Sequence, residues 1–211
     1  MIGCGRTDSG VHAKEFYAHF EVANHDLMAE YDKWMYKFNV VLPHDIAIHE
    51  IIPVEEKANA RFSATARTYQ YFLHHKKDGF LLNRSWYCPY ELDRQRMNEA
   101  AAILFEYKDF SCFSKSRTQV KTNLCTIMRA DWEALENGLV FTIKANRFLR
   151  NMVRAIVGTL IDIGKGKLTI EEFRAIIESK DRSAAGSSAP ACGLYLMKVD
   201  YKEGVLPVVQ Q

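Results

Sequence analysis

Apolar residues recur every three or four positions in four stretches of the chain, a pattern that predicts four amphipathic helices. In the first stretch Tyr31 and Trp34 belong to the apolar stripe, and Asp26 or Asn24 is available as the cap at its start. Pro43 closes this unit, because proline cannot continue a helix. The predicted helices cover residues 26–38, 92–107, 148–163 and 170–179.

Strand signals lie between and after these helices. Residues 61–75 mix β-branched and aromatic side chains with partial alternation, which favours a strand. Residues 126–145 contain two strand-like runs around the polar turn 136–138, so a hairpin is expected, and residues 193–201 form a final strand. Because hairpins replace a strict strand-helix-strand alternation, the pattern predicts an α+β fold with a largely antiparallel sheet.

Composition places the chain among soluble globular proteins. Its 211 residues are 48% hydrophobic and 26% charged, and no apolar run approaches the ~18 residues of a membrane span. The first residues lack the basic and apolar segments of a secretory signal, so we expect a cytoplasmic protein that does not enter the membrane. The formal net charge is only +2, so any affinity for nucleic acid has to come from local clusters of basic residues.

The five cysteines show no C-x-x-C spacing, which argues against a zinc site or a redox pair. An odd number of thiols suits a reducing compartment. We therefore interpret all five as structural residues and expect no bound metal.

The densest chemical signal lies near the N-terminus, where Gly3, Gly5 and Gly10 surround Arg6 and Asp8. Glycines allow sharp turns and close approach of a ligand to the backbone, so such a loop can present both charged groups. An ordinary turn, with Asp8 bound to nearby backbone amides, is the alternative. The glycine spacing fits neither a phosphate-binding loop nor a dinucleotide fingerprint, so a nucleotide cofactor is not supported.

The segment Gly5-Arg6-Thr7-Asp8-Ser9-Gly10-Val11-His12-Ala13 resembles the active-site motif of the TruA-type tRNA pseudouridine synthase family. Other segments resemble further blocks of that family in the same order. These blocks are residues 39–47, 60–71, 109–113, 146–154 and 193–196.

The resemblance implies an isomerase that detaches uracil from its ribose, rotates it and rejoins it through C5, without ATP, metal or organic cofactor. Asp8 matches the catalytic aspartate and is expected to act as the nucleophile. Arg154 matches its basic partner, against the alternative of a solvated helix arginine. Tyr69 matches the active-site tyrosine, whose ring can pack on a flipped base, while simple cross-strand packing is the alternative.

Substrate binding is expected from Tyr69 and from basic residues. Arg6 would fill the space of the displaced base or grip the adjacent phosphate, with a local salt bridge as the alternative. A folded RNA arm needs basic surface, although charge runs are often only solvated faces. The expected substrate-binding arginines are Arg61, Arg67, Arg117 and Arg147, and further basic candidates are Lys14, the run 74–77, Lys115, Lys121 and Arg150.

For the whole chain, the resemblance implies two ferredoxin-like or RRM-like halves with a central active-site cleft. Residues 1–57 would form a partial N-terminal half that carries the Asp8 loop, and residues 58–211 the C-terminal half. In the family a strand and a helix precede the motif, so we expect the N-terminal half to be truncated. The implied partners are the tRNA anticodon stem-loop, at positions 38–40, and a second copy in a homodimer.

Two other classes of protein stay open from the sequence. A non-catalytic RNA-binding or chaperone protein would follow if the shortened N-terminus abolishes activity. A hydrolase would use Asp8 as nucleophile and His12 as base, although no partner that could orient His12 is evident in the sequence.

Overall fold

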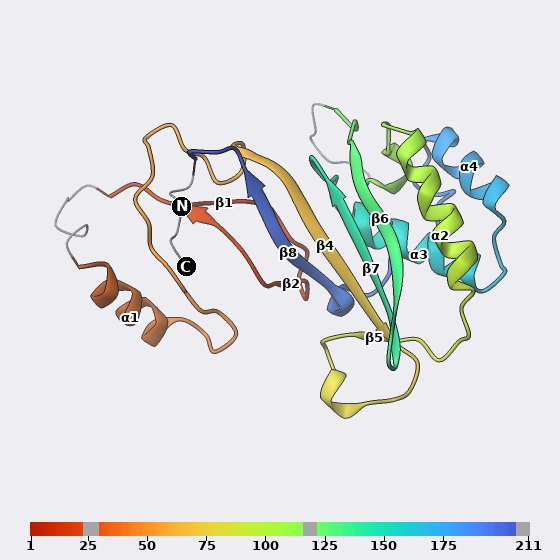
Figure 1. The fold of residues 1–211 in the computed structure, drawn as a ribbon, viewed down its shortest axis with the longest axis horizontal. Helices are drawn as coiled ribbons and strands as arrows, with labels where there is room; N and C mark the ends of the chain where they lie inside the picture. The colour runs from red at the N-terminus through yellow and green to blue at the C-terminus, as the bar shows by residue number, and fades with distance from the viewer. Residues whose placement is uncertain (23–29, 116–121, 206–211) are drawn as a thin grey trace. The chain divides into compact units, whose positions relative to one another are not determined.

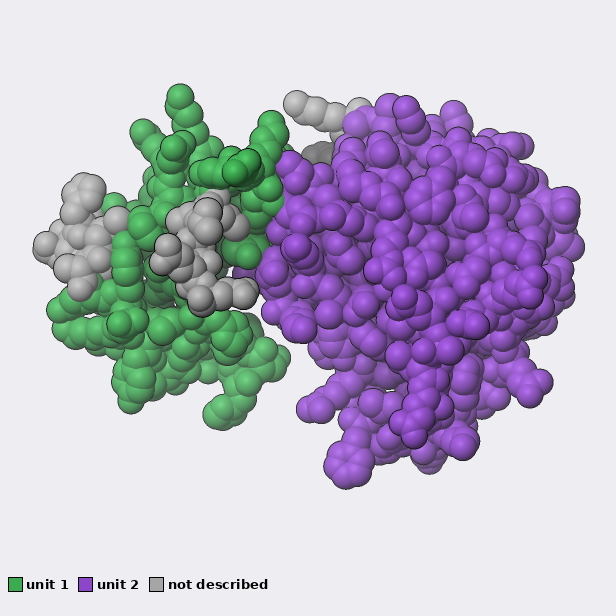
Figure 2. All heavy atoms as spheres, viewed as in Figure 1, with its two compact units in different colours: residues 1–4, 17–64, 201–211 green, residues 5–16, 65–200 purple. Residues whose placement is uncertain are grey.

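A computed structural model describes residues 1–22, 30–115 and 122–205. The chain divides into two compact units, coloured separately in Figure 2. The smaller unit contains residues 1–4, 17–64 and 201–211, and the larger one residues 5–16 and 65–200. The larger unit therefore contains the Asp8 motif.

The larger unit is built on a six-stranded sheet (Figure 1). Its longest pairings are antiparallel, in the β6–β7 hairpin and between β7 and β4, whereas β2 pairs with β8 and β5 with β4 in parallel. The predicted α+β class with a mainly antiparallel sheet is confirmed. The strands, in sheet order, are β2 (His12–Ala13), β8 (Leu194–Tyr201), β4 (Ala64–His74), β7 (Gly138–Ala145) and β6 (Ile127–Leu135), with β5 (Trp86–Tyr87) beside β4.

Three helices lie together beside the sheet in Figure 1: α2 (Arg94–Ile103), α3 (Met152–Gly164) and α4 (Ile170–Ser179). Trp132 and Phe141 are buried, pair across β6 and β7, and have rings that lie 4.9 Å apart. Burial of each such large apolar side chain contributes roughly 1.5–3 kcal/mol. The helices and this face of the sheet therefore form the core of the unit.

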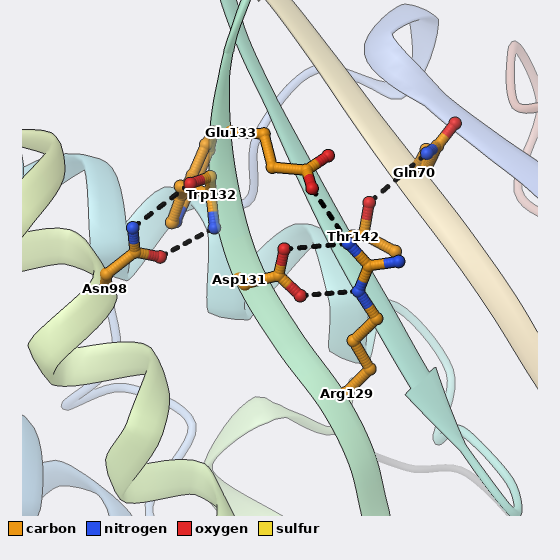
Figure 3. Close-up of polar contacts among 7 residues, drawn as sticks. All are labelled: Gln70, Asn98, Arg129, Asp131, Trp132, Glu133 and Thr142. Carbon is orange, nitrogen blue, oxygen red and sulfur yellow. Dashed lines mark hydrogen bonds and ion pairs between the residues drawn. The ribbon is translucent and has the colours of Figure 1, made fainter.

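The opposite side of the β6–β7 hairpin carries a polar cluster (Figure 3). Asp131 pairs with Thr142 across the strands, and Thr142 accepts a hydrogen bond from Gln70 on β4. Arg129 forms ion pairs with Asp131 and Glu133. Because successive side chains of a strand point to opposite faces, this polar set lies on the face away from Trp132 and Phe141, where Thr142 is itself buried.

The outer edge of β6 is closed by a side chain from α2 (Figure 3). Asn98 accepts a hydrogen bond from the Trp132 backbone N–H at 2.7 Å and donates one to the Trp132 carbonyl oxygen at 3.1 Å. The amide thus imitates a neighbouring strand at one residue and satisfies backbone groups that an edge strand leaves free.

The smaller unit contains a two-stranded antiparallel sheet of β1 (Ile2–Gly3) and β3 (Ala18–His19), and helix α1 (Tyr31–Val41). His19 accepts a hydrogen bond from the Ala60 backbone N–H, and the Tyr201 hydroxyl donates to the Ala60 carbonyl oxygen. These bonds connect three distant parts of the chain within this unit.

The helix predicted at residues 26–38 is present in its described part and extends beyond its expected end. The described helix starts at Tyr31, after Glu30, and runs to Val41. The expected start and both expected caps fall within residues 23–29, outside the described residues. Leu42 is extended, as expected for a residue that precedes proline, and this explains why the helix ends there.

The helix predicted at residues 148–163 begins at Met152, so its expected start was wrong. Asn151 precedes it with a left-handed backbone, φ 66°. The helix predicted at residues 92–107 ends at Ile103 and continues as a short 3₁₀ turn. No helix within the described ranges is long and apolar enough to cross a membrane.

Candidate active site

Asp8 lies in a tight turn that begins the β2 segment. The Val11 backbone N–H donates to the Asp8 carbonyl oxygen at 3.2 Å, and Gly10 has φ +81°. A positive φ at the third position of a turn favours glycine strongly, as in type II turns. The glycine-rich motif therefore encodes this bend, as the sequence suggested.

The turn is attached to the sheet through β2, which pairs in parallel with β8. His12 lies opposite Tyr195, and the Lys14 N–H donates to the Leu196 carbonyl oxygen at 2.8 Å. The Glu15 carboxylate accepts a further bond from the Val199 backbone N–H. These contacts with β8 fix the chain that follows Asp8.

The Asp8 carboxylate faces two arginines. Arg154 donates from Nη1 to its Oδ2 at 2.9 Å, and the Nε of Arg150 lies 3.9 Å from its Oδ1. The Asp8 and Arg154 side chains are 27% and 20% exposed, whereas Arg150 is 59% exposed. Asp8 and Arg154 thus form a half-buried ion pair, with a second cation at its solvent side.

The backbone of residues 186–190, a segment that crosses α3, holds Arg154 in place. Its Nε donates to the Ala189 carbonyl oxygen at 2.7 Å, and its own carbonyl accepts from the Ala189 N–H at 2.9 Å. The segment lies so close to α3 that a Cβ on Gly158 would fall 1.8 Å from the Ser187 carbonyl oxygen. Asn151, before the helix, donates to the Ser188 hydroxyl. The Nε of the Arg154 guanidinium is therefore fixed by Ala189, while its Nη1 reaches Asp8.

Tyr69 and Tyr71 lie two residues apart on β4, so their side chains share one face of the sheet. Tyr71 is fully buried and donates its hydroxyl to the Pro190 carbonyl oxygen at 2.8 Å. Burial raises the pKa of Tyr71, which keeps the phenol neutral. Tyr69 is 8% exposed, and its ring meets that of Phe148 edge-on at 5.2 Å. The 189–190 backbone is thus bonded both to the β4 face that carries Tyr69 and to Arg154.

The other predicted binding residues are dispersed. Arg6 is exposed and makes no ion pair or hydrogen bond with any residue the structure describes. Arg67 lies on β4 at the same alternation as Tyr69, and Arg147 is half-buried after β7. Arg61 belongs to the smaller unit, with its guanidinium over the Phe62 ring, and Arg117 falls outside the described residues.

The described contacts of His12 are with Asn83 and Tyr195. Its Nε2 lies 2.8 Å from the Asn83 carbonyl oxygen and must donate to it, since a carbonyl only accepts. The ring stacks on Tyr195 at 4.4 Å. Among the residues described, the Asp8 carboxylate has arginines as its ion-pair partners, so the geometry lends no support to the hydrolase interpretation.

The five cysteines, all within the described residues, form no disulfide, and four of them are buried. Burial raises the pKa of Cys112 to about 12 and that of Cys125 to about 11. Both therefore stay protonated at neutral pH, as structural cysteines do, because the thiolate is the reactive form.

Two features of the site were missed by sequence reasoning. Arg150 was expected only on a general RNA-binding surface, and it lies before α3, so helical spacing from Arg154 gave no signal of its place beside Asp8. The Ala189 and Pro190 carbonyl oxygens left no signal, because any residue type carries them.

Comparison with known proteins shows the family of the chain. A family model described as tRNA pseudouridine synthase matches residues 100–202. The tRNA pseudouridine synthase A of Parabacteroides distasonis is 49% identical over 99% of this chain and 82% of its own length. That of Bacteroides fragilis is 49% identical over 97% of the chain and 81% of its length, and that of Bacillus subtilis is 40% identical over 95% and 81%.

A mixed α/β fold and an arginine-paired aspartate in a glycine-bounded turn are what the resemblance to pseudouridine synthases led us to expect. Sequence identities of 40–49% over four fifths of the relatives' length show which family the chain belongs to. The chain belongs to the tRNA pseudouridine synthase A family and is an isomerase.

Proposed function

We propose that this protein converts uridine to pseudouridine in tRNA, with Asp8 as the catalytic nucleophile. The observation that carries the proposal is the half-buried ion pair between Asp8 and Arg154, in a turn fixed to the sheet on one side and open to solvent on the other. The family membership supplies the class of reaction and of substrate.

The reaction leaves the composition of the nucleotide unchanged. The bond between ribose C1′ and uracil N1 breaks, and a bond between C1′ and C5 forms. C5 loses its hydrogen as a proton, and N1 takes up a proton, so no oxidant or phosphate donor is needed. The protein has to hold the detached base, exclude competing water and supply one carboxylate.

Asp8 must be ionised in each route open to it, which are attack on the anomeric carbon, attack on the uracil ring, or assistance in forming a glycal. A guanidinium 2.9 Å away stabilises the carboxylate anion. Arg154 also orients the carboxylate, because its Nε is bound to the Ala189 carbonyl oxygen. The Asp8 carboxylate is thereby held in one place before substrate binds.

Tyr69 is proposed to support the detached uracil with its ring and to reach the reacting sugar or base with its hydroxyl. Aromatic contact with an unstacked base is worth roughly 1–3 kcal/mol. Its edge-on contact with Phe148 supports this role, because the contact fixes the plane of the Tyr69 ring.

The finer substrate assignments are also proposals. We place the target uridines in the anticodon stem-loop, at positions 38–40, and expect Arg6, Arg61, Arg67, Arg117 and Arg147 to contact the RNA. A cytoplasmic homodimer of two ferredoxin-like halves around a central cleft, divided near residues 57 and 58, stays a prediction from the resemblance.

The first test follows tritium release from tRNA labelled at C5 of its uridines, with the purified chain and with Asp8→Ala and Asp8→Asn. Both substitutions remove the carboxylate and leave most RNA contacts, so we expect tRNA binding without release. Turnover by either variant would exclude Asp8 as nucleophile.

Release by the wild-type chain that depends on Asp8 would establish the activity. A folded wild-type chain that binds tRNA and releases no tritium would instead favour the non-catalytic RNA-binding interpretation. Mapping of the product by chemical labelling of pseudouridine would then test the positions 38–40.

A further inference from the structure

The connection between β4 and β5 holds apolar side chains out in solvent. Phe80 is 89% exposed and Leu82 is 74% exposed. The 76–85 loop that carries them is well ordered: the Asp78 carboxylate accepts from the Phe80 N–H at 2.8 Å, and the Arg84 N–H donates to the Leu81 carbonyl oxygen at 2.9 Å. A structured loop that presents exposed apolar groups is typical of a contact surface.

The same loop is basic. Lys76, Lys77 and Arg84 are exposed, and Asp78 is the one carboxylate within the loop. None of these three cations forms an ion pair with a residue in the described ranges. Their positive charge is therefore available to an acidic partner. A partner with an apolar or a basic surface would leave these charges unpaired.

The base of the loop is bonded to the chain that follows Asp8. His12 donates to the Asn83 carbonyl oxygen at 2.8 Å, and the Tyr195 hydroxyl donates to the Arg84 carbonyl oxygen at 2.6 Å. The two rings stack on each other at 4.4 Å. Four residues of chain span at most roughly 14 Å, so the base of the loop is fixed close to Asp8.

We infer that the 76–85 loop is a second contact for the tRNA whose uridine occupies the Asp8 site. Phe80 stacks on an unpaired base next to the target, Leu82 packs against it, and the three cations bind the flanking phosphates. His12 and Tyr195 set the distance between this contact and the catalytic turn. The inference rests on the proposed function and specifies where the substrate is held.

The test compares Phe80→Ala, Phe80→Trp and the double variant Lys76→Ala, Lys77→Ala in the full chain. Phe105→Ala is the matched control, at a phenylalanine that is 51% exposed just beyond α2. Filter binding of unmodified tRNA at several salt concentrations gives Kd, and tritium release gives kcat and KM. Thermal unfolding shows that the variants are folded.

We expect Phe80→Ala to raise Kd and KM about tenfold with kcat unchanged, since loss of one stacked base weakens binding by that order. Phe80→Trp should restore binding. The lysine double variant should make the slope of log Kd against log salt concentration shallower by about 1 to 2. Each lost phosphate contact lowers this slope by roughly 0.7–0.9.

Binding by Phe80→Ala within twofold of the control would overturn the inference. A change in molecular mass of Phe80→Ala by light scattering would also overturn it, because the loop would then contact a second copy of the chain. If the wild type binds tRNA through the loop but releases no tritium, only the proposed activity fails. No binding by the wild type overturns both.

Discussion

At the scale of single residues, the pairing of Asp8 with Arg154 rests on two separate donors of one guanidinium. Nη1 reaches the carboxylate while Nε reaches the Ala189 carbonyl oxygen. A lysine ammonium is one point charge on a flexible stem and cannot hold both positions. Arginine is therefore required here for its shape as well as for its charge.

We expect Arg154→Lys to lower kcat for tritium release by at least tenfold while it retains most of the stability. Arg154→Ala should lower kcat further and destabilise the fold by roughly 1–2 kcal/mol, less than a fully buried pair because both side chains are partly exposed. Single-turnover kinetics and thermal melting measure the two effects. Full activity of Arg154→Ala with unchanged melting would refute the pairing.

Much of this site could be predicted from residue types, and some of it could not. A carboxylate among glycines signals a turn, so residue types singled out the Asp8 loop, whereas the roles of Asp8 and Arg154 were expected from the family resemblance. The place of Arg150 beside Asp8 depends on the left-handed backbone of Asn151, which redirects the chain just before α3. No spacing rule reveals such a bend.

At the scale of elements, local sequence patterns predicted the ends of a helix correctly where the capping residues and the apolar periodicity indicated the same boundaries. Helix α4 begins and ends as predicted, because Thr169 and Glu172 form a reciprocal capping box and the apolar stripe ends with the helix. The start of α3 was wrong because Phe148 and Leu149 continue the helical spacing, whereas Phe148 packs on Tyr69. Tertiary packing decided that boundary.

The close crossing at Gly158 leads to a prediction about both stability and activity. Gly158→Ala would place a methyl 1.8 Å from the Ser187 carbonyl oxygen, so α3 and the 186–190 segment must separate. We expect a loss of about 1–3 kcal/mol, as for other overpacked sites, together with reduced kcat because Ala189 holds Arg154. Chemical denaturation and tritium release measure the two losses.

Gly79→Ala is the matched control, because no atom lies within 4 Å of the added methyl. It should keep both stability and kcat. Equal behaviour of the two variants would mean that the crossing does not position Arg154.

Asn98 supports a second prediction at this scale. Asn98→Ala would leave the N–H and carbonyl of Trp132 without their partner on the edge of β6, which costs about 1–3 kcal/mol. The freed edge should also promote self-association. Denaturation and dynamic light scattering test both effects, with Gln95→Ala on the same helix as control. If Asn98→Ala is monodisperse and as stable as the wild type, the two hydrogen bonds between Asn98 and Trp132 are not needed for stability or to prevent self-association.

At the scale of the whole molecule, buried thiols give the fold an alkaline limit. The pKa of Cys112 rises to about 12 and that of Cys125 to about 11 in the folded state, from 9.0 for a free thiol. Above pH 9 the unfolded chain has lost protons that the folded chain keeps. Stability is therefore fully present below pH 9 and falls as the pH rises toward 11–12.

We expect each of these thiols to contribute a decline of at most about 1.4 kcal/mol per pH unit in that window. Cys112→Ala should make the decline shallower, because it removes a thiol whose pKa is raised by burial. Urea unfolding between pH 8 and 11 measures the slopes. A Cys112→Ala curve parallel to the wild type would contradict the assignment.

The long-range assembly of the molecule was the part least accessible from sequence patterns. The α+β class followed from hairpins and helices, but the bond between Glu15 and Val199 joins residues 184 positions apart. Asp8 and Arg154 are 146 positions apart. Periodicity reports only on neighbours along the chain, so the family resemblance and not the pattern placed these residues in one site.

The attachment of β2 to β8 also sets the order in which the protein can mature during synthesis. A ribosome makes the Asp8 turn some 180 positions before the strand that anchors it, Leu194–Tyr201. Domains fold as their segments emerge, at roughly 5–20 residues per second. The nascent chain therefore carries the Asp8 carboxylate for many seconds before the site can form, and the contacts between β2 and β8 arise only after residues 194–201 have emerged.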